Sequence, residues 1–234
     1  MKDLRLDKFL TEMGKGSRSQ VKTYISKGRV TVNGEIIKRP EYKISPEKDI
    51  VNLEGEKVNY SQWEYYMLNK PDGYVSATED NVYPTVIDLI KEYHPGLFPV
   101  GRLDVDTEGL LLITNDGQLA HRLLSPRTHV PKTYYVKVKG RLGIGDVNAF
   151  TKGIPLEDFT CMPSYLNIIN SDEISECEVT IYEGKFHQVK RMFQACGKEV
   201  VYLKRISMGE LKLDENLKLG HYRPLTDEEI NSIL

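Results

Sequence analysis

Several hallmarks of other protein classes are scarce or missing in this chain of 234 residues. It has three cysteines, an odd number, and no C-x-x-C pair, so neither a disulfide framework nor a structural zinc site is expected. No apolar run approaches membrane-spanning length, and the start of the chain, Met1-Lys2-Asp3-Leu4-Arg5, has no apolar signal core. Glycine-rich phosphate loops do not follow any predicted strand. We therefore expect a cytoplasmic protein with no nucleotide cofactor and no membrane association.

The composition is that of a folded globular protein, with 40% hydrophobic and 28% charged residues. Its net charge of −2 is unevenly distributed along the chain. Residues 1–60 contain 13 Lys and Arg against 9 Asp and Glu, whereas the other 174 residues contain 19 and 25. A basic module on an otherwise acidic chain favours nucleic acid or another polyanion as a partner. Surface lysines that only confer solubility are the simpler explanation.

Residues 1–60 are predicted to form a small α+β module of two helices followed by short strands. Either serine of the 16–19 stretch can cap the second helix. Asn33-Gly34 is a dipeptide typical of a tight hairpin turn. Residues 54–62 are polar and without pattern, so we place the domain boundary there and assign residues 62–234 to a second domain.

The N-terminal module resembles the S4-like RNA-binding domain. The pattern R-L-D-x-x-L, then S-R, then I-x-x-G-x-V-x-V-N-G appears nearly intact between Arg5 and Gly34. The resemblance implies that the second helix and the hairpin dock on phosphates of structured RNA, which gives position and salt-sensitive affinity. A merely solvated helical face is the alternative. The residues expected to bind RNA are Lys15, Arg18, Lys22, Lys27, Arg29, Lys38 and Arg39.

The second domain is predicted to be α+β, with a mixed, mainly antiparallel sheet flanked by short helices. Apolar residues alternate over 132–139 and 177–181, which predicts strands. Residues 65–75 predict a strand, a Pro-Asp-Gly turn and another strand. Helical spacing predicts helices at 85–93 and 187–196.

An acidic loop, residues 101–117, leads directly into an apolar strand at 110–113. Asp104, Asp106 and Glu108 alternate along it and could form one solvated face. They could also bind a divalent ion, but neither the EF-hand spacing nor a nearby histidine cluster is present, so no metal is expected. A hydrolase with paired carboxylates is a third possibility. The loop alone does not choose among these.

Three separated segments connect this loop to a known family. Gly101-Arg102-Leu103-Asp104, Lys132-Thr133-Tyr134 and residues 184–192 closely resemble, in order, the three motifs of the RsuA branch of RNA pseudouridine synthases. Residues 67–75 and 220–226 match as well, so the resemblance covers essentially the whole chain. The family implies an isomerisation in which uracil is detached from its ribose, rotated and rejoined through C5. This reaction implies no cofactor.

The resemblance also implies a role for each residue of the site. Asp104 matches the catalytic aspartate, Tyr134 the tyrosine that packs on the base, and Lys190 the cation paired with the aspartate. Without the motifs, Tyr134 would be a core residue and Lys190 an exposed lysine. Arg102 is expected to fill the gap left by the flipped base, and Val189 to pack beneath it. The residues expected to bind substrate are Arg102, Leu103, Lys132, Val189 and Arg191.

A basic rim is expected around Asp104, because this domain has a net negative charge and must nevertheless bind RNA. The rim is predicted to contain Arg122, Arg127, Lys132, Lys185, Arg191, Lys204 and Arg205.

The implied substrate is ribosomal RNA, and one uridine of 16S rRNA is the preferred target. A 23S rRNA enzyme of the same branch is the alternative within the class. A non-catalytic RNA-binding protein of ribosome assembly and a hydrolase that releases free uracil are the alternatives outside it. The partner is expected to be naked 16S rRNA or a partly assembled small subunit, and the protein is expected to be a monomer.

Overall fold

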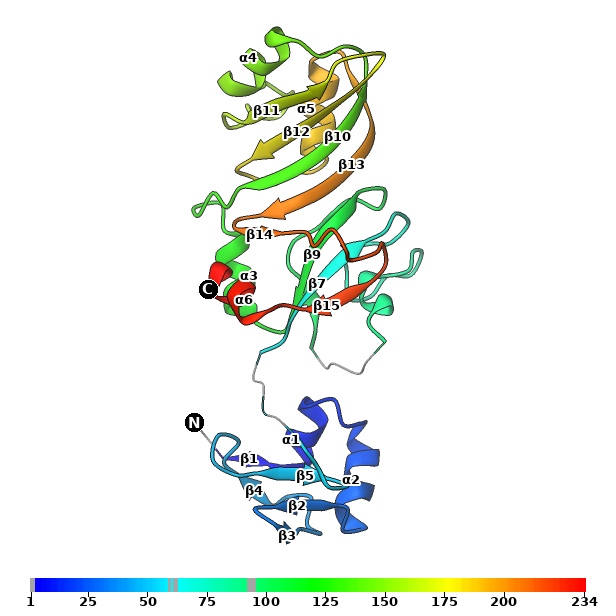
Figure 1. Ribbon diagram of the computed structural model, residues 1–234, viewed down its shortest axis with the longest axis vertical. Helices are drawn as coiled ribbons and strands as arrows, with labels where there is room; N and C mark the ends of the chain where they lie inside the picture. The colour runs from blue at the N-terminus through cyan, green and yellow to red at the C-terminus, as the bar shows by residue number, and fades with distance from the viewer. Residues whose placement is uncertain (1–2, 59, 61–62, 92–95) are drawn as a thin grey trace. The chain divides into compact units, whose positions relative to one another are not determined.

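The computed structural model describes residues 3–58, 60, 63–91 and 96–234. It divides the chain into two compact units, Met1–Glu64 with Ile90–Leu97, and Tyr65–Leu89 with Phe98–Leu234 (Figure 1). The predicted boundary at residue 61 lies outside the described residues and stays a prediction. Within the described ranges, no helix has the length and apolar character needed to span a membrane.

The first unit packs two helices against short strands. The helices are α1 (Leu6–Glu12) and α2 (Arg18–Ser26), and the strands are β1 (Leu4–Arg5), β2 (Val30–Val32), β3 (Glu35–Ile36), β4 (Lys43–Ile44), β5 (Val51–Leu53) and β6 (Glu56–Lys57). Phe9 from α1, Ile25 from α2 and Val51 from β5 meet in one apolar core. Ser17 is the serine that caps α2, because its side chain accepts a hydrogen bond from the backbone N–H of Gln20.

Two tight hairpins organise these strands. Asn33 and Gly34 both have positive φ and join β2 to β3, as the sequence predicts. Glu54 and Gly55 also have positive φ and join β5 to β6. The interpretation of residues 54–62 as patternless is therefore wrong at its start, where a second two-residue turn extends the sheet.

A nine-stranded sheet is the frame of the second unit in the described part of the chain. Its strands are β7 (Tyr65–Lys70), β8 (Phe98–Pro99), β9 (Glu108–Thr114), β10 (Lys132–Lys139), β11 (Tyr165–Asn170), β12 (Ile174–Ile181), β13 (Glu199–Met208), β14 (Leu211–Lys212) and β15 (Tyr222–Pro224). The main order is β11-β12-β10-β13-β9-β7-β15. Among the described strands only β13 and β9 run parallel, so the predicted mixed, mainly antiparallel sheet is confirmed.

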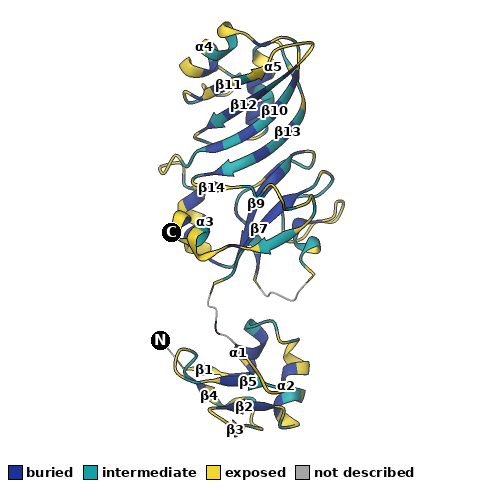
Figure 2. Cartoon of the chain, viewed as in Figure 1, coloured by how far each residue is buried: buried dark blue, intermediate teal, exposed yellow. Residues whose placement is uncertain are grey.

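Short helices cover the two ends of this sheet (Figure 1). At one end, α4 (Ile144–Lys152) and α5 (Gln188–Ala195) meet through Phe150 and Phe193, whose ring centroids are 5.0 Å apart. At the other end, the apolar residues of α3 (Gly117–Leu124) and α6 (Asp227–Ile233) share a core with β7 and β9. Figure 2 shows buried residues running through the sheet strands and exposed ones on the outer helix faces. Four short helices therefore support one continuous sheet.

Two elements differ from the sequence prediction. The second strand expected within residues 65–75 does not form, because Val75 makes only one isolated bridge with Thr85. The expected helix at 85–93 is a single 3-10 turn, Val86–Leu89, and residues 92–95 lie outside the described ranges. Asp88 closes this turn by accepting hydrogen bonds from the backbone N–H and the hydroxyl of Thr85, which satisfies a short turn without a longer helix.

Gly109 makes the junction between the two halves of the sheet possible. It pairs with Arg205 where β9 runs parallel to β13, and its φ of +100° lies in the region that favours glycine. A Cβ at this position would collide with the backbone carbonyl of Arg205. The sheet therefore closes next to the acidic loop only because residue 109 has no side chain.

Gly109→Ala should lower the free energy of unfolding by about 2 kcal/mol or more, since it adds both strain and a backbone clash. Urea unfolding measures the change. Gly117→Ala is the matched control, because residue 117 lies at the start of α3 with no atom near the added Cβ, and this variant should be neutral or slightly more stable. Equal stabilities of the two variants would contradict the argument.

Candidate active site

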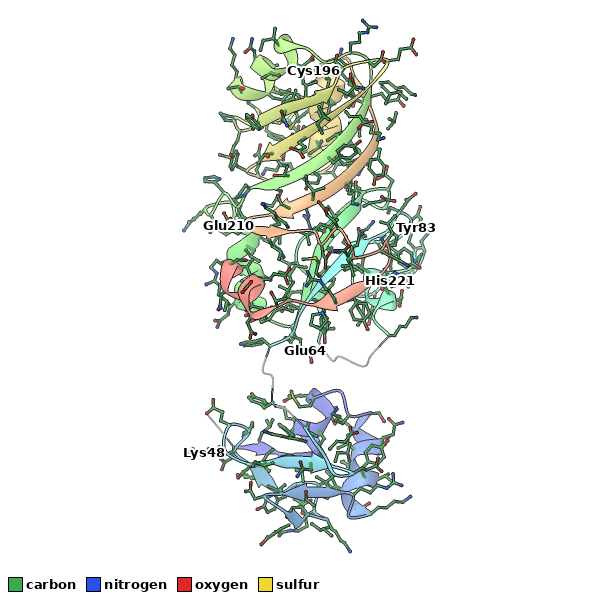
Figure 3. The ribbon with its side chains drawn as sticks, viewed as in Figure 1. Lys48, Glu64, Tyr83, Cys196, Glu210 and His221 are labelled. Carbon is green, nitrogen blue, oxygen red and sulfur yellow. The ribbon has the colours of Figure 1, made fainter. Side chains whose placement is uncertain are left out.

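Asp104 and Lys190 form the centre of the site, although 86 positions separate them in the sequence. Asp104 lies on the loop that precedes β9, and Lys190 lies in the first turn of α5. The Lys190 ammonium is 3.1 Å from Oδ2 of Asp104 and 2.5 Å from Oδ1 of Asp106. α5 ends at Ala195, directly before Cys196, which Figure 3 labels. One lysine therefore bridges two carboxylates of the loop.

The electrostatics of this cluster favour the charged forms of Lys190 and Asp106. Burial alone would lower the pKa of Lys190, but hydrogen bonds with Asp106 and Asp104 raise it above its usual value. Burial would likewise raise the pKa of Asp106, but the hydrogen bond from Lys190 lowers it. Glu108 has a different partner, since it accepts a hydrogen bond of 2.6 Å from the Tyr202 hydroxyl. The three acids of the loop thus have different surroundings, and only two of them share the lysine.

His187 is a second neighbour of Asp104 that the sequence did not place at the site. Its Nε2 atom is 3.6 Å from Oδ1 of Asp104. His187 precedes α5 in the left-handed conformation, with φ of 47°, and its ring stacks on Phe186 with centroids 3.7 Å apart. The Phe186 side chain is 75% exposed. The sequence could have indicated both residues through the 184–192 motif, because His187 lies three positions and Phe186 four positions before Lys190.

Tyr134 lines a small pocket of about 70 Å³ together with Asp104 and Val189. It lies on the buried face of β10, which begins at Lys132 and continues through Val136 and Val138. Because Tyr134 is 8% exposed and still borders the pocket, it is both a core residue and a wall of the site. Leu103 borders the same pocket.

A larger groove of about 750 Å³ shares Arg102, Asp104 and Tyr134 with the small pocket. Acidic side chains are fewer along it than basic ones and histidines. The acids are Asp80, Asp104 and Glu183; the others are Arg102, His129, Lys132, Lys185, His187 and Arg205. A groove with more basic than acidic side chains suits a polyanion.

The predicted basic rim is correct only in part. Lys132, Lys185 and Arg205 line the groove, but Lys132 and Arg205 are buried at 9% and 3% exposure and lie in its wall. Arg191, predicted to bind substrate, pairs instead with Asp158 and lies over the ring of Phe159. The groove lining also lacks Arg122, Arg127 and Lys204. Charge counts along a sequence do not reveal which cations a fold turns toward one groove.

Lys70 received no role from the sequence, yet it holds the loop that carries Asp104. It is fully buried, and its ammonium donates hydrogen bonds of 2.8–3.0 Å to the carbonyls of Pro71, Val105 and Thr107. Burial lowers its pKa to about 8, although nearby acids oppose this change. Three acceptors match the three hydrogens of an ammonium group. The sequence offered one indication of this role, a lysine at the end of an apolar strand.

In the first unit, all seven residues predicted to bind RNA are exposed. Among the described residues, only Arg29 of these seven takes part in an ion pair, with Glu54 at 2.9 Å. Arg29 also lies over the ring of Tyr24, and Arg39 over that of Tyr42. The other six cations have no acidic partner in the described ranges and are available to phosphates.

No group of three or more His, Cys, Asp or Glu side chains that could hold a metal ion occurs in the ranges that the structure describes. The arrangement instead presents one carboxylate, held by a lysine and bordered by a tyrosine, at the edge of a cationic groove. Such a carboxylate can act as a nucleophile or as a base on a planar group in the pocket.

Comparisons with known proteins match both units of the chain. The family model described as RNA pseudouridylate synthase matches residues 64–195, and that of the S4 domain matches residues 4–51. An uncharacterized RNA pseudouridine synthase of Bacillus subtilis is 47% identical, over 97% of both chains. Ribosomal small subunit pseudouridine synthase A of Escherichia coli is 42% identical, over 99% of this chain and 100% of its own.

A crystal structure of a pseudouridylate synthase aligns with a TM-score of 0.68 and 42% identity, covering 99% of this chain and 100% of that one. The fold and the site thus define an RNA-modifying enzyme built on a mixed sheet. The chain belongs to the RNA pseudouridine synthase family and carries an N-terminal S4 domain.

Lys70→Met should leave three buried carbonyls without a donor and loosen the Asp104 loop. We expect a loss of about 1–3 kcal/mol in the free energy of unfolding and a lower rate of pseudouridine formation in the molecules that remain folded. Urea unfolding and single-turnover kinetics measure the two effects. Lys212→Met, on the exposed part of β14, is the control and should change neither. An unaltered rate in folded Lys70→Met would show that the anchor is unnecessary.

Phe186→Ala should weaken RNA binding without affecting folding, because the ring is exposed and offers a stacking surface to a base. Such stacking contributes about 1–3 kcal/mol, so KM for RNA should rise roughly 5-fold to 100-fold while kcat changes little. Steady-state kinetics test this. Val82→Ala, at an exposed apolar residue outside the groove, is the control. If both variants behave like wild type, Phe186 does not contact the RNA.

Proposed function

We propose that this protein converts one uridine of 16S rRNA, the RNA of the small ribosomal subunit, to pseudouridine. The observation that carries the proposal is the Asp104 carboxylate, held by Lys190 at a pocket whose wall includes Tyr134. Relatives that cover nearly the whole chain and are named ribosomal small subunit pseudouridine synthase A support the choice of subunit. A 23S rRNA target has no such support among them.

Each residue of the site has a separate role in this reaction. The target uridine leaves the RNA stack, since its N1–C1′ bond cannot be reached in a helix. Its base enters the small pocket against Tyr134 and Val189, while exposed Arg102 fills the vacated space. Lys190 keeps Asp104 oriented and compensates its charge. These roles are those expected for the matching motif positions.

The chemistry balances without an oxidant or reductant. The N1–C1′ bond breaks, a C5–C1′ bond forms, and the hydrogen on C5 leaves as a proton while N1 gains one. Asp104 is the only carboxylate among the residues that line the small pocket, so it is the group available to drive this exchange.

We further infer that the protein acts as a monomer in the cytoplasm. One chain supplies both the exposed cations of the S4 domain and a complete set of site residues, so no second subunit is required. The S4 domain would supply affinity for structured RNA, and the groove would supply the local contacts around the target.

The test uses 16S and 23S rRNA labelled with tritium at C5 of uridine. Wild type should release tritium from 16S rRNA, and Asp104→Asn should be at least about 10³-fold slower. Asp106→Asn is the matched control, because it removes the other carboxylate on Lys190 and should stay within about 10-fold of wild type.

Each other outcome has a distinct meaning. Release of tritium from 23S rRNA alone would show that the target uridine lies in the RNA of the large subunit. Free uracil among the products would indicate a hydrolase. Binding to rRNA without any release would indicate a non-catalytic RNA-binding protein, and equal rates for wild type and Asp104→Asn would remove Asp104 from the mechanism.

A further inference from the structure

Lys132 and Arg205 are two buried cations in the wall of the groove. Lys132 lies at the start of β10 and is 9% exposed, and Arg205 lies in β13 and is 3% exposed. Both line the groove that contains Asp104. Lysine and arginine are almost never buried to this extent without a partner of opposite charge.

Neither cation has such a partner among the described residues. In the part of the chain that the structure describes, neither takes part in an ion pair. The Lys132 ammonium donates to the carbonyl of Val130 at 2.7 Å, and Nε of Arg205 donates to the carbonyl of Leu110 at 2.8 Å. Nη2 of Arg205 is buried and has no hydrogen-bond partner. Donors of both side chains therefore remain unused.

The acids that line the groove are engaged elsewhere. Asp104 pairs with Lys190, Glu183 accepts hydrogen bonds from the Met162 backbone and the Gln188 amide, and Asp80 accepts two from its own loop. Burial, with repulsion from Arg205 in addition, lowers the pKa of Lys132. The two cations thus destabilise each other in the free protein.

The strand register brings both cations next to the base pocket. Arg205 is the direct cross-strand partner of Tyr134, and Lys132 lies two residues before Tyr134 on the same strand. Paired residues and residues two apart point to the same face of a sheet, so all three side chains share one face. A group bound by the cations would lie beside the ring that borders the pocket.

We propose that Lys132 and Arg205 form a binding site for one phosphate of the RNA backbone, beside the flipped uridine. The inference rests on the proposed function and names the group that compensates the two charges. A phosphodiester supplies one negative charge and two free oxygens, which suits an ammonium and a guanidinium side by side. Holding this phosphate fixes the ribose, and with it the C1′ atom, relative to Asp104.

Lys132→Met separates this role from a structural one. Removing one of two like charges should leave the free energy of unfolding unchanged or higher, while kcat/KM for a 16S rRNA fragment should fall about 10-fold or more. Lys139→Met, at the exposed end of β10, is the control and should match wild type. Folded Lys132→Met with the kcat/KM of wild type would overturn the phosphate site and leave the proposed function intact.

A second experiment locates the phosphate. Each phosphate near the target uridine is replaced in turn by a neutral methylphosphonate. Wild type should lose activity sharply at one position, and Lys132→Met should be much less sensitive at that same position. Equal sensitivity of both proteins at every position would overturn the inference. A wild type that forms no pseudouridine in any rRNA would overturn the proposed function and this inference together.

Discussion

The buried ammonium of Lys70 is the contact on which the site depends. Two of its three hydrogen bonds reach carbonyls of the Asp104 loop, so the end of β7 holds a segment that has no regular structure. Ser76 adds to this restraint by bonding both the N–H and the carbonyl of Leu103. A loop fixed in this way presents its carboxylate in one position, which preorganised catalysis requires.

The charged side chains of the site, the groove and the S4 domain are arranged according to what each part binds. Lys190 pairs with two carboxylates at the centre, and the groove beside them contains Lys132 and Arg205, which have no acidic partner in the described part of the chain. The S4 domain repeats this pattern with exposed cations. The net charge of −2 therefore does not describe the surfaces that meet RNA. Local arrangement, rather than composition, determines where a polyanion binds.

Much of the local structure could be predicted, because its causes are local. Asn33-Gly34 forms its hairpin, one of the two candidate serines, Ser17, caps α2, and alternation marks β10. The prediction of a helix at 85–93 was wrong, because Asp88 closes a short turn there. The hydrogen bonds that close it are not visible in the hydrophobic periodicity of the sequence. Resemblance to motifs, and not spacing, singled out Asp104, Tyr134 and Lys190.

The sequence by itself determined the S4 and synthase modules, the sheet class and the three motif residues. Only the tertiary structure brought His187 to Asp104, buried Lys70 beneath the loop, and buried Lys132 and Arg205 in the groove wall while directing Arg191 to Asp158. The reason is that hydrophobic periodicity and turn residues determine structure over only a few neighbouring positions of the chain. Side chains far apart in the chain meet only through strand register, including the parallel contact that Gly109 permits.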